Sequence, residues 1–345
     1  MNIKSLLMLS LLLLSVSNRA VNAQDQKFAD LGDFKLENGQ IIRNLKFGYR
    51  TFGTMNAERS NIIVFPMWAG GQTSQLNLKP SDNGKLIDTS KYFVIAIDPL
   101  SNGVSSSPSN SKSQPRMKFP GYTMRDVVNS EYDFLTRSMG ISHVKCIMGV
   151  SMGGMQTFQW MVSYPDFMDL AIPMVGSPQL APYDLLHWQT QIDVIMNDPN
   201  WRQGDYKKNP AREFEYEIGS IILTTPDDYN RKMTREKVFE QINKAKTETG
   251  GFDANDKIRQ DQAMMSINVT DKFGSSWERA AAAVKAKTFV IVARFDHTVT
   301  PSPALRFADL LKAKTLVLQG DCGHMAPSCE SEKVNAEIAA FLDNN

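Results

Sequence analysis

Short apolar segments rich in β-branched residues recur along the chain, and each is nearly continuous rather than alternating with polar residues. This pattern is typical of strands covered on both faces, as in a parallel sheet. The segments span residues 61–65, 92–97, 144–149, 170–175, 288–293 and 314–319. Ahead of them, residues 33–36 and 45–52 flank a Glu-Asn-Gly turn signal and predict an antiparallel pair at the sheet edge.

Helical patterns lie between the apolar segments. Thr123 is suited to cap a helix that runs to about Met139, with Gly140 just beyond it. Residues 153–164 predict a second helix, which Pro165 ends, and residues 303–311 and 332–341 predict two more. Because strands and helices alternate, the sequence predicts an α/β fold whose mostly parallel sheet has helices on both faces.

The alternation stops over residues 181–276, a polar stretch with helical patterns at 183–196 and 231–246 and no convincing pair of strands. About a hundred residues are too many for a loop between two core strands. We therefore interpret this stretch as a helical lid inserted into one domain that spans residues 24–345. A homodimer formed through the lid is a further hypothesis.

Residues 1–23 have the pattern of a cleavable signal peptide. Lys4 is followed by an apolar stretch over residues 6–16, and Val21-Asn22-Ala23 supplies small residues for cleavage. An apolar stretch of eleven residues is too short to span a hydrocarbon layer of roughly 30 Å. We expect secretion or export to the periplasm, with a buried N-terminal helix as the alternative.

Composition excludes several other classes of protein. The 345 residues include 38 basic and 37 acidic side chains, and this balance argues against a nucleic-acid binder. No later apolar stretch reaches about 18 residues, so we expect no membrane span in the mature chain. Three cysteines without a Cys-x-x-Cys pair disfavour a zinc site, and we expect neither a metal nor another cofactor. Cys322 and Cys329 are either paired in a disulfide or free thiols.

The apolar segment 144–149 leads directly into Gly-Val-Ser-Met-Gly at residues 149–153, with a predicted helix behind it. In this context the Gly-x-Ser-x-Gly motif is typical of a sharp turn that presents a nucleophilic serine. Ser151 is the candidate nucleophile. A serine hydroxyl needs a base to take its proton and an acid to orient that base.

We expect the acid and then the base to follow the serine in the chain. His324 comes after the last apolar strand in a glycine-flanked loop, and it is the candidate base. Asp296 follows segment 288–293 and is the candidate acid, whereas Asp321 lies too near His324 in sequence to reach its far ring nitrogen. The remaining histidines fit the role less well; they are His143, His187 and His297.

An acyl-transfer site also needs backbone N–H groups that stabilise an oxyanion. Met152, directly after the nucleophile, is the first candidate. The second belongs to the loop after segment 61–65, where we choose Trp68 and keep Met67 as the alternative.

A resemblance to a known family rests on three groups of residues. They are Phe-Pro-Gly-Tyr-Thr-Met-Arg-Asp at 119–126, Gly-Val-Ser-Met-Gly-Gly-Met-Gln at 149–156, and Trp160 with Tyr164-Pro165. From about residue 45 onward the chain resembles the homoserine O-acetyltransferase family of α/β-hydrolase-fold proteins. The resemblance implies an eight-stranded sheet and the same roles for Ser151, Asp296, His324, Trp68 and Met152. The oxyanion loop, the residues after His324 and the lid differ from the family pattern.

These observations favour an exported serine hydrolase that acts on a small ester or another activated acyl substrate. An O-acyltransferase that uses acetyl-CoA is the alternative within enzymes, because both reactions share an acyl-serine intermediate. A non-catalytic binding protein of the same fold is the alternative outside enzymes.

Overall fold

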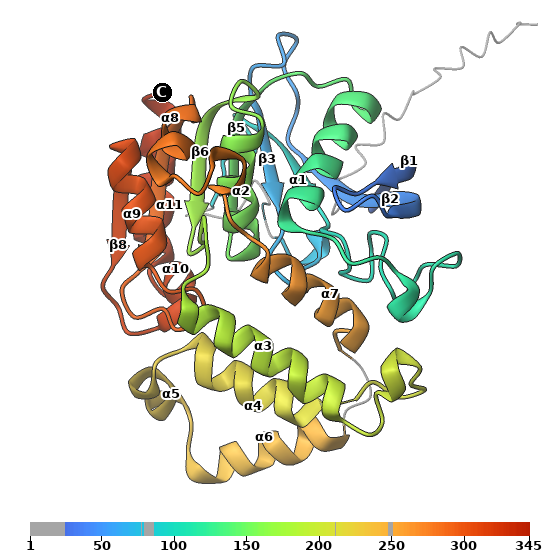
Figure 1. The fold of residues 1–345 in the computed structure, drawn as a ribbon. Coiled ribbons are helices and arrows are strands. Elements are labelled where there is room, and N and C mark those ends of the chain that lie inside the picture. Colours follow the sequence, from blue (N-terminus) through green and yellow to red (C-terminus); the bar gives the residue numbers. More distant parts are fainter. Residues whose placement is uncertain (1–24, 77, 79–85, 211, 248–250) are drawn as a thin grey trace, which may run out of the picture.

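The computed structural model describes residues 25–76, 78, 86–210, 212–247 and 251–345. The predicted signal peptide therefore lies outside the described residues. Within them, eight strands form one sheet in the order β1-β2-β4-β3-β5-β6-β7-β8 (Figure 1). The strands are β1 (Lys27–Lys35), β2 (Ile41–Phe52), β3 (Ile62–Pro66), β4 (Phe93–Ile97), β5 (Val144–Val150), β6 (Met168–Met174), β7 (Lys287–Ala293) and β8 (Lys314–Leu318).

The strand directions confirm the prediction of a mostly parallel sheet. Strand β2 pairs antiparallel with both β1 and β4. The pairs from β4 through β3, β5, β6 and β7 to β8 are all parallel. The parallel strands therefore present their carboxyl ends at one edge of the sheet, where the loops after β3, β5, β7 and β8 meet.

Both faces of the sheet are covered, which explains why its central strands lack alternation. In β3, Ile62 and Val64 join the core beneath α1 (Met124–Asp133), α2 (Met152–Ser163) and α9 (Ser302–Leu311). Ile63 and Phe65 join the core on the other face, with α11 (Ser331–Asp343). Each successive side chain in a strand points to the opposite face, so two helical layers require a continuous apolar segment.

The predicted helix starts and ends are close to those observed. The Thr123 hydroxyl accepts a hydrogen bond from the Asp126 N–H, and the Asp126 carboxylate accepts one from the Thr123 N–H. This reciprocal pair begins α1 where the sequence placed the cap. The helix ends at Asp133, and one wider turn (Phe134–Ser138) continues it almost to Met139.

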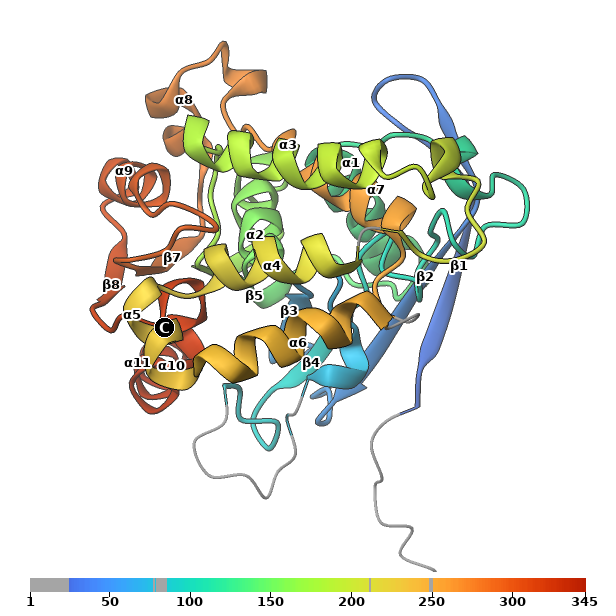
Figure 2. The same cartoon turned by 90° about the horizontal axis from the view of Figure 1, so that it is seen from below.

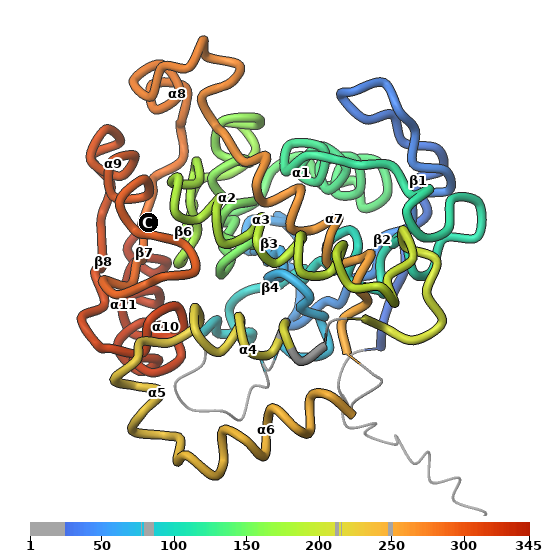
Figure 3. The backbone as a smooth tube through the Cα atoms, turned by 60° about the horizontal axis from the view of Figure 1, so that its bottom comes forward, coloured from blue at the N-terminus to red at the C-terminus, as the bar shows by residue number. Residues whose placement is uncertain are grey.

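Helices connect β6 to β7 over the region interpreted as a lid. They are α3 (Pro182–Asn197), α4 (Arg212–Leu223), α5 (Pro226–Lys232), α6 (Arg235–Thr247), α7 (Ala254–Met265) and α8 (Trp277–Ala283). Figures 1, 2 and 3 show α3, α4 and α6 crossing the carboxyl edge of the sheet, and Figure 1 shows α7 between α3 and the sheet. The helix predicted at 231–246 is observed as α6, but it begins at Arg235, because Met233 adopts an extended conformation and separates α6 from α5.

No helix in the described part of the chain combines the length and the apolar character needed to cross a bilayer.

Candidate active site

Ser151 occupies a sharp turn between β5 and α2. Its backbone has φ 59° and ψ −119°, a conformation that residues other than glycine rarely adopt. Glycine is needed on both sides of it. A Cβ on Gly149 would lie 2.5 Å from the backbone of Gly153, and one on Gly153 would lie 2.3 Å from the Pro66 carbonyl oxygen. The two glycines thus let the turn close and hold Ser151 at the carboxyl end of β5.

The three side chains proposed to act together are in hydrogen-bond contact. The Ser151 hydroxyl lies 2.9 Å from His324 Nε2, and His324 Nδ1 lies 2.7 Å from Asp296 Oδ2. Asp296 is 4% exposed and His324 is 7% exposed. A carboxylate accepts a hydrogen bond, so Nδ1 carries the proton in this arrangement and Nε2 is left to accept the proton of the Ser151 hydroxyl.

Backbone N–H groups fix the Asp296 carboxylate. Its Oδ1 atom accepts hydrogen bonds from the N–H groups of Thr298 at 2.8 Å and Val299 at 2.9 Å. Its Oδ2 atom therefore faces His324. Asp321, the competing acid, is directed elsewhere: Arg231 donates to its two oxygens at 2.5 and 2.7 Å.

The other histidines lie outside this chain of hydrogen bonds. His143 contacts the Asp169 carboxylate, and His297 is exposed. His187, by contrast, donates from Nε2 to the Thr298 carbonyl at 2.7 Å. Burial lowers the pKa of His187, which favours the neutral ring whose Nδ1 can accept a hydrogen bond from Gln191.

His187 belongs to a set of contacts that sequence reasoning missed. His187 of α3 donates the hydrogen bond to the Thr298 carbonyl. Asp184 of the same helix accepts hydrogen bonds from the N–H and the hydroxyl of Thr300, both at 3.1 Å. From α4, the Ile222 carbonyl accepts a hydrogen bond from the Thr298 hydroxyl at 2.8 Å. The helices between β6 and β7 thus position the loop that carries Asp296. These pairs are about 80 to 115 residues apart, and no local pattern signals them.

The two candidate oxyanion donors start from neighbouring strand ends. Met67, the alternative to Trp68, is excluded because its N–H donates to the Ile97 carbonyl at 3.2 Å. No acceptor engages the N–H of Trp68 or Met152 in the part of the chain that the structure describes. The buried Gln156 side chain donates to the carbonyls of Met67 and Met152, both at 3.2 Å, and thereby ties the two loops together.

Ser151 and His324 open into a cavity of about 820 Å³ beneath the helices that connect β6 and β7. Most of its described lining is apolar, including Trp68, Leu76, Met174, Ile222 and Phe252. Besides Ser151 and His324, the polar side chains of the described lining are fewer; they are Gln191, Lys257, Thr298, Ser328, Ser331 and Asn335. Such a lining suits the apolar parts of a small substrate and leaves a few positions to set its orientation.

The loop that carries His324 is fixed at both ends. A disulfide joins Cys322 and Cys329, which settles the alternative that the sequence left open. The Thr225 hydroxyl donates to the Asp321 carbonyl at 2.5 Å, so the start of α5 also holds this loop.

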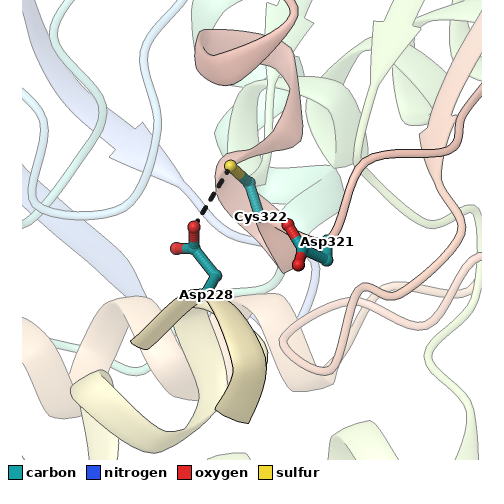
Figure 4. A group of neighbouring side chains, drawn as sticks. All are labelled: Asp228, Asp321 and Cys322. Atoms are coloured by element: carbon teal, nitrogen blue, oxygen red, sulfur yellow. Dashed lines mark hydrogen bonds between the residues drawn. The ribbon is translucent and has the colours of Figure 1, made fainter. Parts of the chain in front are cut away.

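Figure 4 shows three potential metal ligands in this loop region, Asp228, Asp321 and Cys322, which lie within 4.8 Å of one another. The Cys322 sulfur is bonded in the disulfide and offers no thiolate. Arg231 pairs with both carboxylates, and Lys232 pairs with Asp228. The charges of the two carboxylates are therefore balanced by side chains, and the arrangement does not suit a cation.

Comparisons with known proteins agree on one family. The model of the α/β hydrolase fold family matches residues 62–328. A homoserine O-acetyltransferase of Methanosalsum zhilinae is 26% identical over 353 aligned residues, covering 90% of this chain and 71% of that protein. An ethyl acetate hydrolase of Pseudomonas veronii is 26% identical over 288 residues, covering 80% of this chain and 82% of that protein.

Solved structures agree on the fold. The acetyl esterase MekB matches with a TM-score of 0.85 and 23% identity, covering 92% of this chain and 97% of that chain. The family match, at residues 62–328, extends over well more than half of the sequence. The chain therefore belongs to the α/β-hydrolase fold family: it is an enzyme of this fold and resembles the homoserine O-acetyltransferases and esterases.

Proposed function

We propose that this protein is an exported serine esterase that works through an acyl-serine intermediate. The observation that carries the proposal is the continuous chain from Ser151 through His324 to Asp296, at the wall of a largely apolar cavity. The ethyl acetate hydrolase among its relatives supports the same reaction class.

The reaction follows from the positions of the side chains. The Ser151 oxygen attacks the ester carbonyl while His324 Nε2 takes the hydroxyl proton, and Asp296 stabilises the resulting imidazolium. The N–H groups of Trp68 and Met152 stabilise the oxyanion of the tetrahedral intermediate. His324 then gives its proton to the leaving alcohol, and the acyl group remains on Ser151. A water molecule, deprotonated by His324, releases the acid in the same way.

Ser151→Ala and His324→Gln test these roles. Each should lower kcat for a short ester by roughly 10⁴-fold or more while leaving the thermal unfolding curve close to that of the wild type. His143→Gln is the matched control, since His143 lies away from the cavity, and it should retain full activity. Wild-type turnover in either Ser151→Ala or His324→Gln would show that the roles are misassigned.

Acyl transfer to an alcohol acceptor is the second candidate, and it is favoured by the homoserine O-acetyltransferase that aligns with 90% of this chain. The two reactions differ in what attacks the acyl-serine. Incubation with acetyl-CoA and homoserine separates them: an esterase forms acetate, whereas a transferase forms O-acetylhomoserine faster than acetate. Failure of a fluorophosphonate probe to label Ser151 would instead favour a non-catalytic binding protein.

We propose export through cleavage after Ala23. The charged start, the apolar stretch and the small residues before the cleavage point support it. The Cys322–Cys329 disulfide is also suited to an oxidising compartment. Intact-mass measurement of the protein recovered from the periplasm or medium should fit residues 24–345 less two hydrogen atoms. Retention of residues 1–23 would contradict export by cleavage.

We also propose a homodimer formed through the helices between β6 and β7. Exposed apolar side chains on three of them support it; they are Leu186 on α3, Phe214 and Ile221 on α4, and Phe239 on α6. Light scattering coupled to size exclusion should give twice the chain mass, and Ile221→Glu should shift it toward the monomer. A wild-type monomer at micromolar concentration would contradict the proposal.

A further inference from the structure

The substrate cavity contains one feature that ester hydrolysis itself does not require. Lys257, on α7, is 8% exposed and lines the same cavity as Ser151 and His324. Among the described residues that line this cavity, it is the single lysine or arginine, and none is aspartate or glutamate. Its ammonium group is therefore the formal charge that the described residues of the lining contribute.

Asp261 forms a buried ion pair with Lys257. The Nζ atom lies 3.0 Å from Asp261 Oδ2 and 3.3 Å from Oδ1, and Asp261 is 1% exposed. An ammonium group has three donors, so the pair leaves donor capacity for another acceptor. Apolar residues often replace a buried ion pair without loss of stability. Stability alone therefore gives little reason for a lysine at this wall.

Two residues of α3 that carry N–H donors line the same cavity. The Trp188 ring is 5.5 Å from Lys257 Nζ, and its indole N–H is buried without an acceptor among the described residues. Gln191, one helical turn along, also lines the cavity and donates to His187 Nδ1 at 3.4 Å. A cation in a cavity that N–H donors also line is complementary to an acceptor group that carries negative charge.

We infer that Lys257 binds a carboxylate of the substrate, so that the preferred substrate is a small ester bearing one free carboxylate. This inference rests on the proposed esterase function and specifies its substrate class. A single ammonium group matches a monoanion better than a phosphate, which would need more positive charge. The described residues of the cavity wall include no carboxylate for an ammonium group, so a simple carboxylate ester fits them better than an amino-acid ester.

Matched ester pairs test the inference. Monomethyl adipate and methyl hexanoate differ in a carboxylate on the acyl side, and 4-acetoxybutanoate and butyl acetate differ in one on the alcohol side. The variant is Lys257→Met combined with Asp261→Asn, which removes the pair without leaving a buried charge unpaired. Lys285→Met is the control, because this exposed lysine pairs with Asp166 and does not line the cavity.

The measured quantity is the ratio of kcat/KM for the anionic ester to that for its neutral partner. In at least one pair, the double variant should lower this ratio by about tenfold to a hundredfold, as expected when a buried charged contact is lost. Lys257→Arg should keep part of the preference, and Lys285→Met should keep all of it. If wild type and double variant give the same ratio in both pairs, the inference is wrong.

A binding measurement separates this inference from the proposed function. Calorimetry with the Ser151→Ala protein measures the Kd of monomethyl adipate without turnover. Adding Lys257→Met and Asp261→Asn should raise that Kd by about tenfold or more. If no ester is hydrolysed by the wild type but this binding difference is found, the esterase proposal fails and the carboxylate site stands. Equal affinity in the two proteins would overturn the site.

Discussion

The two sides of the candidate active site are built in different ways. The nucleophile side is local: Gly149, Ser151 and Gly153 lie within five residues, and backbone contact with Pro66 fixes them against the sheet. The acid and base lie on loops after β7 and β8 that are held by long-range contacts, including His187 with Thr298 and Thr225 with Asp321. Changes in the helices between β6 and β7 can therefore alter the substrate cavity and the alignment of Asp296 and His324 together, while the serine turn stays unchanged.

The largest effect should come from filling the close contact on the nucleophile side. Gly153→Ala places a Cβ 2.3 Å from the Pro66 carbonyl oxygen, so β3 and α2 must separate. We expect a loss of at least about 3 kcal/mol in the free energy of unfolding, measured by chemical denaturation. Gly121→Ala is the control, because its Cβ would meet its nearest neighbour, the Arg259 side chain, at an ordinary 3.5 Å. A Gly153→Ala protein as stable as the control would refute the tight-turn explanation.

A buried carboxyl group also supports the nucleophile side. Glu131 on α1 is fully buried and accepts a hydrogen bond from the Trp160 indole of α2 at 2.9 Å. Burial raises the pKa of Glu131 to about 8, from an ordinary value of 4.5. Between pH 4.5 and about 8, the folded protein therefore keeps Glu131 protonated, whereas the unfolded chain releases this proton. The contribution of Glu131 to the free energy of unfolding is therefore fully present below pH 4.5 and is lost as the pH rises toward 8.

Glu131→Gln should remove this pH dependence. One pKa unit corresponds to about 1.4 kcal/mol, so the wild type should lose about 3 kcal/mol between pH 4.5 and 7 through this group. The stability difference between Glu131→Gln and the wild type should therefore shift in favour of the variant as the pH rises. Glu58→Gln, at an exposed position, controls for the change in net charge. Parallel stability curves for Glu131→Gln and the wild type would contradict this account.

Most of the fold followed from the sequence because its signals are local. Continuous apolar segments predicted the central strands, and Thr123 with Asp126 marked the start of α1. The length of β1 was underestimated, because a strand at the sheet edge has mixed burial and a weak apolar pattern. The break between α5 and α6 was missed because the polar, amphipathic pattern continues across Met233.

The site was predictable where chain order and strand ends constrain it. The sequence placed Ser151, Asp296 and His324 at ends of parallel strands, and the structure brings their side chains together. The support from His187 and Asp184 was not predictable, because it depends on how α3 lies against a loop more than 100 residues away. Lys257 and Asp261 have the i, i+4 spacing of a solvated helix face, and their burial is visible in the structure alone.

The smallest effect should come from the exposed ion pair on the base side. Arg231→Met removes the contact of α5 with the Asp321 carboxylate but leaves the Thr225 bond and the disulfide in place. Because both partners are substantially exposed, at 56% and 40%, we expect kcat to fall by about twofold to fivefold with KM unchanged. Arg231→Lys should restore part of the loss.

The pH dependence of this pair is opposite to that of Glu131. The Arg231 guanidinium lowers the pKa of Asp321 below its ordinary value of 3.8. The contribution of the pair is therefore present above pH 3.8 and is lost as the pH falls through the lowered pKa. As the pH falls, the difference in kcat between Arg231→Met and the wild type should therefore shrink. The stability difference between Glu131→Gln and the wild type should instead grow as the pH rises. An Arg231→Met enzyme with wild-type kcat at neutral pH would mean that Thr225 and the disulfide suffice to position His324.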